Sequence, residues 1–174
     1  MPGGCTGRGL QDDRVAPLTL AMDSMMGFTM QEGILAAQAL ASGAMCGLIW
    51  FVQVVHYPLF AASAGHASSA YALENQRRTS WVVVPFMLVE MATAALVALD
   101  PPASIGRGPA VGGVVLILAI WLSTALVQMP LHARLAREGH AATTVASLVR
   151  GNWFRTMAWT GRAVLAIWML RVAG

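Results

Sequence analysis

The sequence predicts an all-α protein, a four-helix transmembrane bundle made of two repeated helical hairpins. The chain of 174 residues is 57% hydrophobic and only 11% charged, whereas soluble domains carry roughly 25% charged residues. Four runs approach the roughly 20 apolar residues that a helix needs to cross the hydrocarbon core of a bilayer. Two short motifs also recur in the same order in each half of the chain. Together these observations predict lipid as the solvent and duplication as the origin of the bundle.

The N-terminal residues 1–30 are rich in glycine, mixed in charge and without hydrophobic periodicity, which predicts a disordered tail. They also lack the basic and apolar regions typical of a signal peptide. The transmembrane domain is expected over residues 31–174, with spans at about 34–56, 81–99, 110–131 and 152–172. A turn rich in helix breakers, Asp100 to Pro109, joins the second and third spans. The other two connections are longer.

The internal repeat is carried by two motifs. Pro58–Ala61 is echoed by Pro130–Ala133, and Asn75–Thr79 is echoed by Asn152–Thr156. Each half therefore contains a helix, a P-L-x-A segment, a connection, an N-x-x-R-T segment, a tryptophan and a second helix. This order predicts two hairpins that are related by an axis along the membrane normal.

The basic residues are all arginine, because the chain contains no lysine. They lie between and at the ends of the apolar runs, which indicates contact with lipid headgroups and does not favour a nucleic-acid-binding face. The two long connections and the helix starts beside them hold more arginines than the opposite side does. By the positive-inside rule, these connections are expected in the cytoplasm. The arginines on this side are Arg77, Arg78, Arg134, Arg137, Arg150 and Arg155.

Polar residues converge at the span ends that meet the long connections. Ionisable side chains at such depth normally face the interior of a bundle, so this cluster predicts a functional site. The candidate catalytic residues are His56, His132, Arg78 and Arg155. The candidate substrate-binding residues are Gln53, Asn75, Trp81, Gln128, Asn152, Trp153 and Trp159. A purely structural interpretation stays open, in which the asparagines cap helices, the tryptophans form an interface belt and the prolines end helices.

Glu90 and Arg162 are ionisable residues predicted to lie deeper in the membrane, on the second and fourth spans. An isolated charge there is costly, so one interpretation is a buried ion pair between the two side chains. The other is that Glu90 carries a proton below the polar cluster. Neither a metal-binding motif nor a nucleotide-binding glycine motif is present, so no metal is expected. Cys5 and Cys46 are not spaced as a redox pair.

The segments His56–Phe60, Arg77–Thr79 and Asn152–Thr156 resemble small four-helix bacterial membrane proteins of the anthrone oxygenase-like family, over about Ile34 to Arg171. The resemblance implies a bacterial inner-membrane protein that oxidises a lipophilic aromatic substrate without a cofactor. It further implies a histidine as the base, His56 or His132. Arginine, asparagine and glutamine would then stabilise an oxyanion, and the tryptophans would stack on a flat substrate.

Two other functional classes compete with this hypothesis. One is a non-catalytic membrane protein, acting as an accessory, lipid-binding or transporter-like subunit. The other is a haem-binding electron carrier with His56 and His132 as axial ligands. The expected partners are membrane lipids, a lipophilic small molecule, and either further copies of the chain or a larger membrane protein. Nucleic acid is not expected as a partner.

Overall fold

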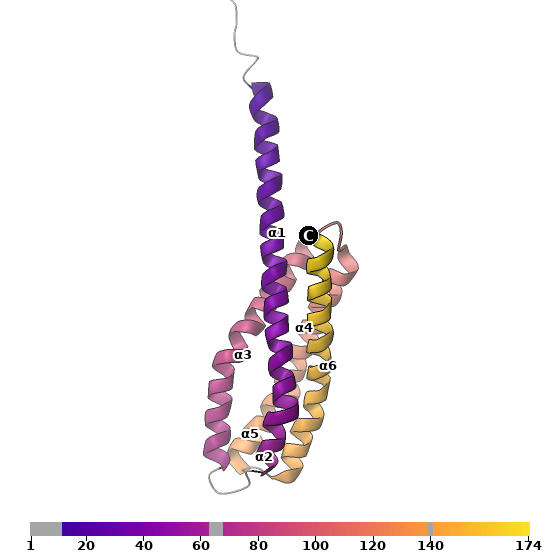
Figure 1. The fold of residues 1–174 in the computed structure, drawn as a ribbon. Coiled ribbons are helices and arrows are strands. Elements are labelled where there is room, and N and C mark those ends of the chain that lie inside the picture. Colours follow the sequence, from indigo (N-terminus) through magenta and orange to yellow (C-terminus); the bar gives the residue numbers. More distant parts are fainter. Residues whose placement is uncertain (1–11, 63–67, 139–140) are drawn as a thin grey trace, which may run out of the picture.

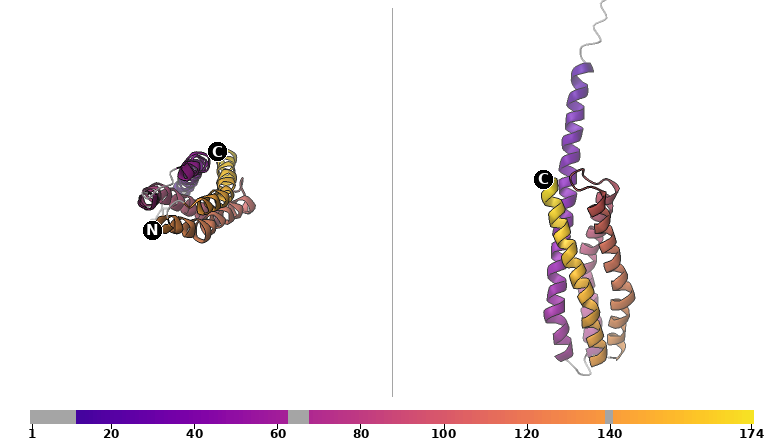
Figure 2. Two further views of the ribbon diagram at one scale, coloured as in Figure 1. Left: turned by 90° about the horizontal axis from the view of Figure 1, so that it is seen from below. Right: turned by 90° about the vertical axis from the view of Figure 1, so that its right-hand side faces the viewer.

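The computed structural model describes residues 12–62, 68–138 and 141–174, and within them the predicted all-helical fold is confirmed. Four long helical rods lie side by side (Figures 1 and 2). The first rod is continuous through α1 (Asp12–Phe51), the π-helix η1 (Val52–His56) and α2 (Tyr57–Ala62). The second is α3 (Ser68–Leu99), and the third runs through α4 (Arg107–Ser123), the π-helix η2 (Thr124–Gln128) and α5 (Met129–Glu138). The fourth is α6 (Ala142–Ala173).

Neighbouring rods run in opposite directions. The first rod packs against α3 and α6, and the third rod packs against the same two helices. The turn between α3 and α4 lies at the end of the bundle that also holds the C-terminus, whereas α2 and α5 lie at the opposite end (Figure 1). Gly106 closes this turn with a positive φ of 72°, a conformation that residues with a Cβ rarely adopt.

Three of the segments are long and apolar enough to cross a membrane: Met30–Leu59, Ala70–Leu99 and Arg107–Glu138. Large apolar side chains such as Leu88, Leu118 and Leu122 are exposed on the outside of the bundle. The interior instead contains many buried polar side chains. This inverted distribution suits a protein whose outer surface faces lipid. The buried polar residues are Gln38, Ser42, Gln53, Glu90, Thr93, Gln128, Asn152, Arg155, Thr156 and Arg162.

Helix α6, which contains the predicted fourth span, is not among the three apolar segments. Its sequence includes Arg155 and Arg162, and both side chains are buried against the other helices. Its outward-facing residues include Phe154, Val164 and Ile167. Arg155 and Arg162 therefore lie inside the bundle, whereas Arg150 and Arg171 are exposed. Between these two exposed arginines, the outer face of α6 is largely apolar.

Several helix starts differ from the sequence-based expectation. The predicted disordered tail is wrong for residues 12–30, which belong to α1, while residues 1–11 lie outside the described part of the chain. Leucine, alanine and methionine are frequent in this stretch, and all three have high helix propensity. Helices α3 and α6 begin well before Asn75 and Asn152, so neither asparagine caps a helix. The capping interpretation is therefore wrong for both.

The prolines of the two P-L-x-A segments do not end their helices either. Pro58 and Pro130 each follow a five-residue π-helix inside a continuous rod. Proline lacks an N–H group, and its ring displaces the carbonyl four residues earlier. A π-helix, with its i→i+5 hydrogen bonds, provides the extra space. The N–H of Tyr57 accordingly donates to the Val52 carbonyl, and that of Met129 donates to the Thr124 carbonyl.

Candidate functional site

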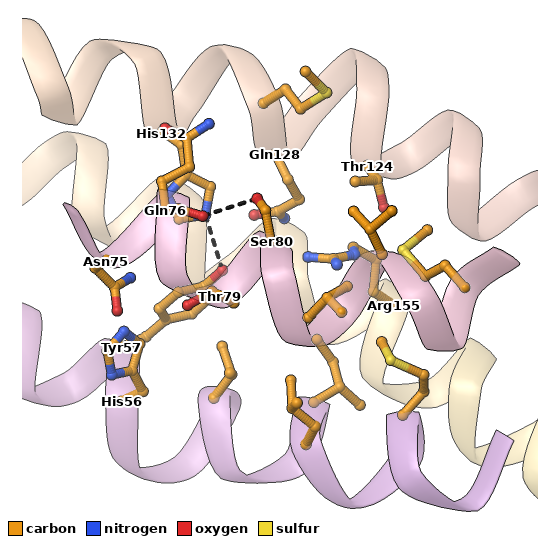
Figure 3. Close-up of a pocket in the computed structure, with 18 residues that line it drawn as sticks. His56, Tyr57, Asn75, Gln76, Thr79, Ser80, Thr124, Gln128, His132 and Arg155 are labelled. Atoms are coloured by element: carbon orange, nitrogen blue, oxygen red, sulfur yellow. Dashed lines mark hydrogen bonds between the residues drawn. The ribbon is translucent and has the colours of Figure 1, made fainter. Parts of the chain in front are cut away.

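A cavity of about 280 Å³ lies near the end of the bundle that holds α2 and α5. Residues from all four rods line it (Figure 3). Met45, Met87 and Met129 contribute to its apolar walls together with leucine, isoleucine and valine side chains. The polar lining residues are His56, Tyr57, Asn75, Gln76, Thr79, Ser80, Thr124, Gln128, His132 and Arg155.

The cavity reaches the side of the bundle between α3 and the third rod. Val84 on α3 and Met129 on α5 both line it, yet they are 46% and 55% exposed. Both residues lie within candidate membrane spans. A lipophilic molecule therefore has a lateral route from the bilayer into the cavity.

Tyr57 is central to the polar part of the cavity, although it is not among the candidate residues predicted from the sequence. Its hydroxyl oxygen lies 3.3 Å from Nε2 of His132 (Figure 3). The same hydroxyl interacts with the guanidinium of Arg155. Helical spacing from Gln53 allows both His56 at i+3 and Tyr57 at i+4 on the inward face. The packing of the bundle buries Tyr57 and leaves His56 only partly buried.

A chain of hydrogen-bonded amide groups that do not line the cavity fixes the position of Arg155. Its Nη1 donates to Oδ1 of Asn152 over 3.0 Å, and Nδ2 of Asn152 donates to Oε1 of Gln53 over 2.8 Å. Nε2 of Gln53 in turn donates to the Val149 carbonyl over 3.3 Å. The Trp159 ring lies under the guanidinium, at 5.1 Å from its central carbon. Gln53, Asn152 and Trp159 thus orient Arg155 without lining the cavity.

Some buried polar atoms at the cavity have no hydrogen-bond partner. They are Nε of Arg155 and both amide atoms of Gln128, and each side chain is at least nine-tenths buried. A buried polar group without a partner costs about 1–3 kcal/mol. Both side chains point into the space between the rods in Figure 3. A bound molecule with a polar atom in this space would remove that cost.

Three of the predicted site residues lie away from the cavity, because they occupy outward faces of their helices. Arg78 is paired with Glu74 at 2.6 Å, and its side chain is 76% exposed. Trp81 is 74% exposed. Trp153 packs edge-on against Trp50 on the surface. Since Trp159 is buried under Arg155, none of the predicted tryptophans lines the cavity, and the predicted stacking with a substrate is not provided by them.

Glu90 and Arg162 are both buried, but they do not form a direct ion pair. The Glu90 carboxylate accepts hydrogen bonds from the Ser42 hydroxyl at 2.6 Å and from the Trp159 indole N–H at 2.9 Å. The guanidinium of Arg162 lies against Gly113, where a Cβ would approach Nη1 to 2.8 Å. The indole N–H of Trp159, one turn before Arg162 on α6, donates to the Glu90 carboxylate in place of the Arg162 guanidinium.

In the described part of the chain, no three histidine, cysteine, aspartate or glutamate side chains gather in a way that could hold a metal ion. Comparisons with protein-family models, with curated proteins and with solved structures find no match to this chain.

Proposed function

We propose that this chain is a multi-pass membrane protein that binds a small lipophilic molecule in the cavity and oxidises it as a cofactor-independent oxygenase. The observation that carries the proposal is the meeting of an apolar, laterally open cavity with the cluster of Tyr57, His132 and Arg155. Ligand pockets combine these two features: apolar walls that bury the body of the ligand, and a few placed polar groups that orient it.

The proposed chemistry is the oxidation of an activated CH₂ group by dioxygen. A histidine of the cavity, His56 or His132, removes one proton from this carbon and leaves a carbanion. Arg155 and Tyr57 stabilise the charge that conjugation places on the carbonyl oxygen of the substrate. The carbanion then reacts with O₂, one oxygen atom becomes the new carbonyl, and the other leaves as water with the two hydrogens. The substrate loses four electrons and O₂ gains four.

We further propose that α6 is the fourth membrane span and that the cavity end faces the cytoplasm of a bacterial inner membrane. The apolar outer face of α6 supports the first point, because its buried arginines do not meet lipid. The excess of arginines at the cavity end supports the second. A membrane-impermeant maleimide should label Arg150→Cys, in a background without Cys5 and Cys46, only from the cytoplasmic face.

A duplication of one hairpin is supported by the matching positions of the two π-helices. Each occupies the five residues that begin six positions before the proline of a P-L-x-A segment. Helices α3 and α6, which follow these segments, are both 32 residues long. We infer that both halves of the bundle derive from one ancestral helix pair.

The main alternative is a non-catalytic lipid-binding, accessory or transporter-like subunit, and the same laterally open cavity favours it. The geometry favours a haem carrier less. Nε2 of His132, which would have to bind the iron if Nδ1 did not, already lies within hydrogen-bond distance of the Tyr57 hydroxyl.

Oxygen consumption with anthrone tests the proposal in the purified full-length chain in detergent. We expect His56→Ala/His132→Ala to lower turnover by about 10²–10⁴-fold, the range for general acid–base catalysis. Arg150→Gln, on an exposed position of α6, is the matched control and should retain turnover. Unchanged turnover in the double variant would overturn the oxygenase proposal. Loss of turnover after treatment with a metal chelator would overturn its cofactor independence.

A further inference from the structure

We infer that the cavity selects an anion: a molecule with an apolar body and a carboxylate, phenolate or enolate oxygen, bound by Arg155 and Gln128. The inference rests on the proposed function for the lipophilic cavity and adds the charge of its ligand. Carboxylates, phenolates and enolates of this kind share one chemistry, a delocalised oxyanion on a hydrocarbon frame.

The charges around the cavity are unbalanced. Among the described lining residues, Arg155 is the only one with a permanent charge, and none is an aspartate or a glutamate. The titratable groups that face it are His56 and Tyr57 from the first rod and His132 from α5. Helix α3 contributes only uncharged side chains to the lining. No carboxylate of the lining therefore neutralises the guanidinium.

The contacts behind Arg155 are also neutral. They are the amide oxygen of Asn152 and the ring of Trp159. The carboxylate of Glu90 lies beyond the indole of Trp159 and is bound to it and to Ser42. A cation in a low-dielectric interior attracts an anion far more strongly than it does in water. The cavity thus favours a ligand that supplies the missing negative charge.

The unpartnered donors match an oxyanion in chemical kind. Nε of Arg155 and Nε2 of Gln128 are both buried without a partner, and both residues line the cavity. Guanidinium and amide N–H groups are strong donors to a charged oxygen. Gln128 is also held close to α6, because at Gly151 a Cβ would lie only 3.1 Å from Nε2. Arg155 and Gln128 thus contribute a cationic donor and a neutral donor to the lining of the same cavity.

This selectivity also fits the proposed chemistry. The enolate of a lipophilic weak acid, formed by loss of a proton to water or to a cavity histidine, is the form whose electron-rich carbon reacts with O₂. A site that prefers the anion raises the population of this reactive form at a given pH.

Matched ligands test the inference by isothermal titration of the full-length chain in a non-ionic detergent. The probes are 2-naphthoate and its neutral isostere 2-naphthamide, with decanoate and decanol as the aliphatic pair. We expect 2-naphthoate to bind about ten- to a hundredfold more tightly than 2-naphthamide, as typical for hydrogen bonds to a charged group. Arg155→Gln should remove this difference, Gln128→Leu should reduce it, and the control Arg150→Gln should keep it.

The outcomes separate the two proposals. Equal affinity for 2-naphthoate and 2-naphthamide in the wild-type chain overturns the anion inference and leaves the lipophilic cavity in place; this comparison needs no variant. Failure of all four probes to bind overturns the proposed function itself. Tighter binding of decanoate than of 2-naphthoate supports the anion and identifies an aliphatic acid, which overturns the aromatic substrate.

Discussion

The interior of the bundle contains two polar regions that differ in charge balance. The cavity region comprises Tyr57, Gln128, His132 and Arg155, and the central polar cluster comprises Ser42, Glu90, Trp159 and Arg162. In the central cluster a carboxylate with two donors lies within electrostatic reach of a guanidinium. In the cavity region a guanidinium faces open space without a carboxylate. In the central cluster the opposite charges of Glu90 and Arg162 offset each other, although the guanidinium nitrogens of Arg162 have no hydrogen-bond partner. A guanidinium that lines a cavity without a carboxylate is instead suited to binding a ligand.

The largest effect is expected from Glu90→Ala, which removes the only carboxylate of the central polar cluster. The Trp159 N–H and the Ser42 hydroxyl lose their acceptor, and Arg162 loses the negative charge nearest to it in this cluster. Breaking such a buried charge arrangement costs about 3–5 kcal/mol. Thermal unfolding in detergent should show a large loss of stability. Glu74→Ala, at a surface ion pair, is the control and should leave the unfolding temperature unchanged. A fully stable Glu90→Ala variant with no turnover would instead indicate a proton carrier.

The next largest effect is expected from Asn152→Ala, which separates Arg155 from its support. Gln53 and Arg155 would each lose a buried partner, at about 1–3 kcal/mol per unpaired group. Stability should fall in the unfolding assay, and the affinity for 2-naphthoate should fall more than that for 2-naphthamide. An equal fall for both ligands would show that Asn152 supports the helices and not the orientation of Arg155.

Tyr57→Phe should have a moderate effect that is confined to the cavity region. It removes one hydroxyl group from the contacts with His132 and Arg155 and keeps the buried ring. The expected loss of stability is about 1 kcal/mol, the typical net contribution of one hydrogen bond. Turnover of anthrone should fall by a larger factor than the decrease in the fraction of folded protein accounts for. If turnover stays at the wild-type level, Tyr57 has no role in stabilising the oxyanion.

The smallest effect is expected from Arg78→Gln, although the sequence placed Arg78 among the catalytic candidates. Its side chain is exposed and paired with Glu74, and exposed ion pairs contribute little to stability. Unfolding temperature, ligand affinity and turnover should all equal those of the wild-type chain. A clear loss of turnover would mean that α3 presents Arg78 to the substrate in another arrangement of the bundle.

Much of the arrangement of polar and apolar regions in the bundle could be predicted from the sequence, because hydrophobic runs and their polar interruptions are visible in the order of the residues. Helical spacing placed Asn152, Arg155, Trp159 and Arg162 on one stripe of a helix, and all four are buried. The lengths of the apolar runs predicted the number of helical rods, and the order of the motifs predicted that the polar residues lie at one end of the bundle. Periodicity establishes which residues of a helix share a face.

Only the tertiary structure decided which of those faces points inward and what it meets. Asn75 lines the cavity while Arg78, three residues later, points away from it, because the packing of α3 against its neighbours fixes the rotation of the helix. Tyr57 and His56 both line the cavity, but the packing of the rods buries Tyr57 more deeply than His56. The Glu90 carboxylate accepts a hydrogen bond from Trp159 and not from Arg162. Such choices depend on contacts between residues distant in sequence, which the spacing along one helix does not contain.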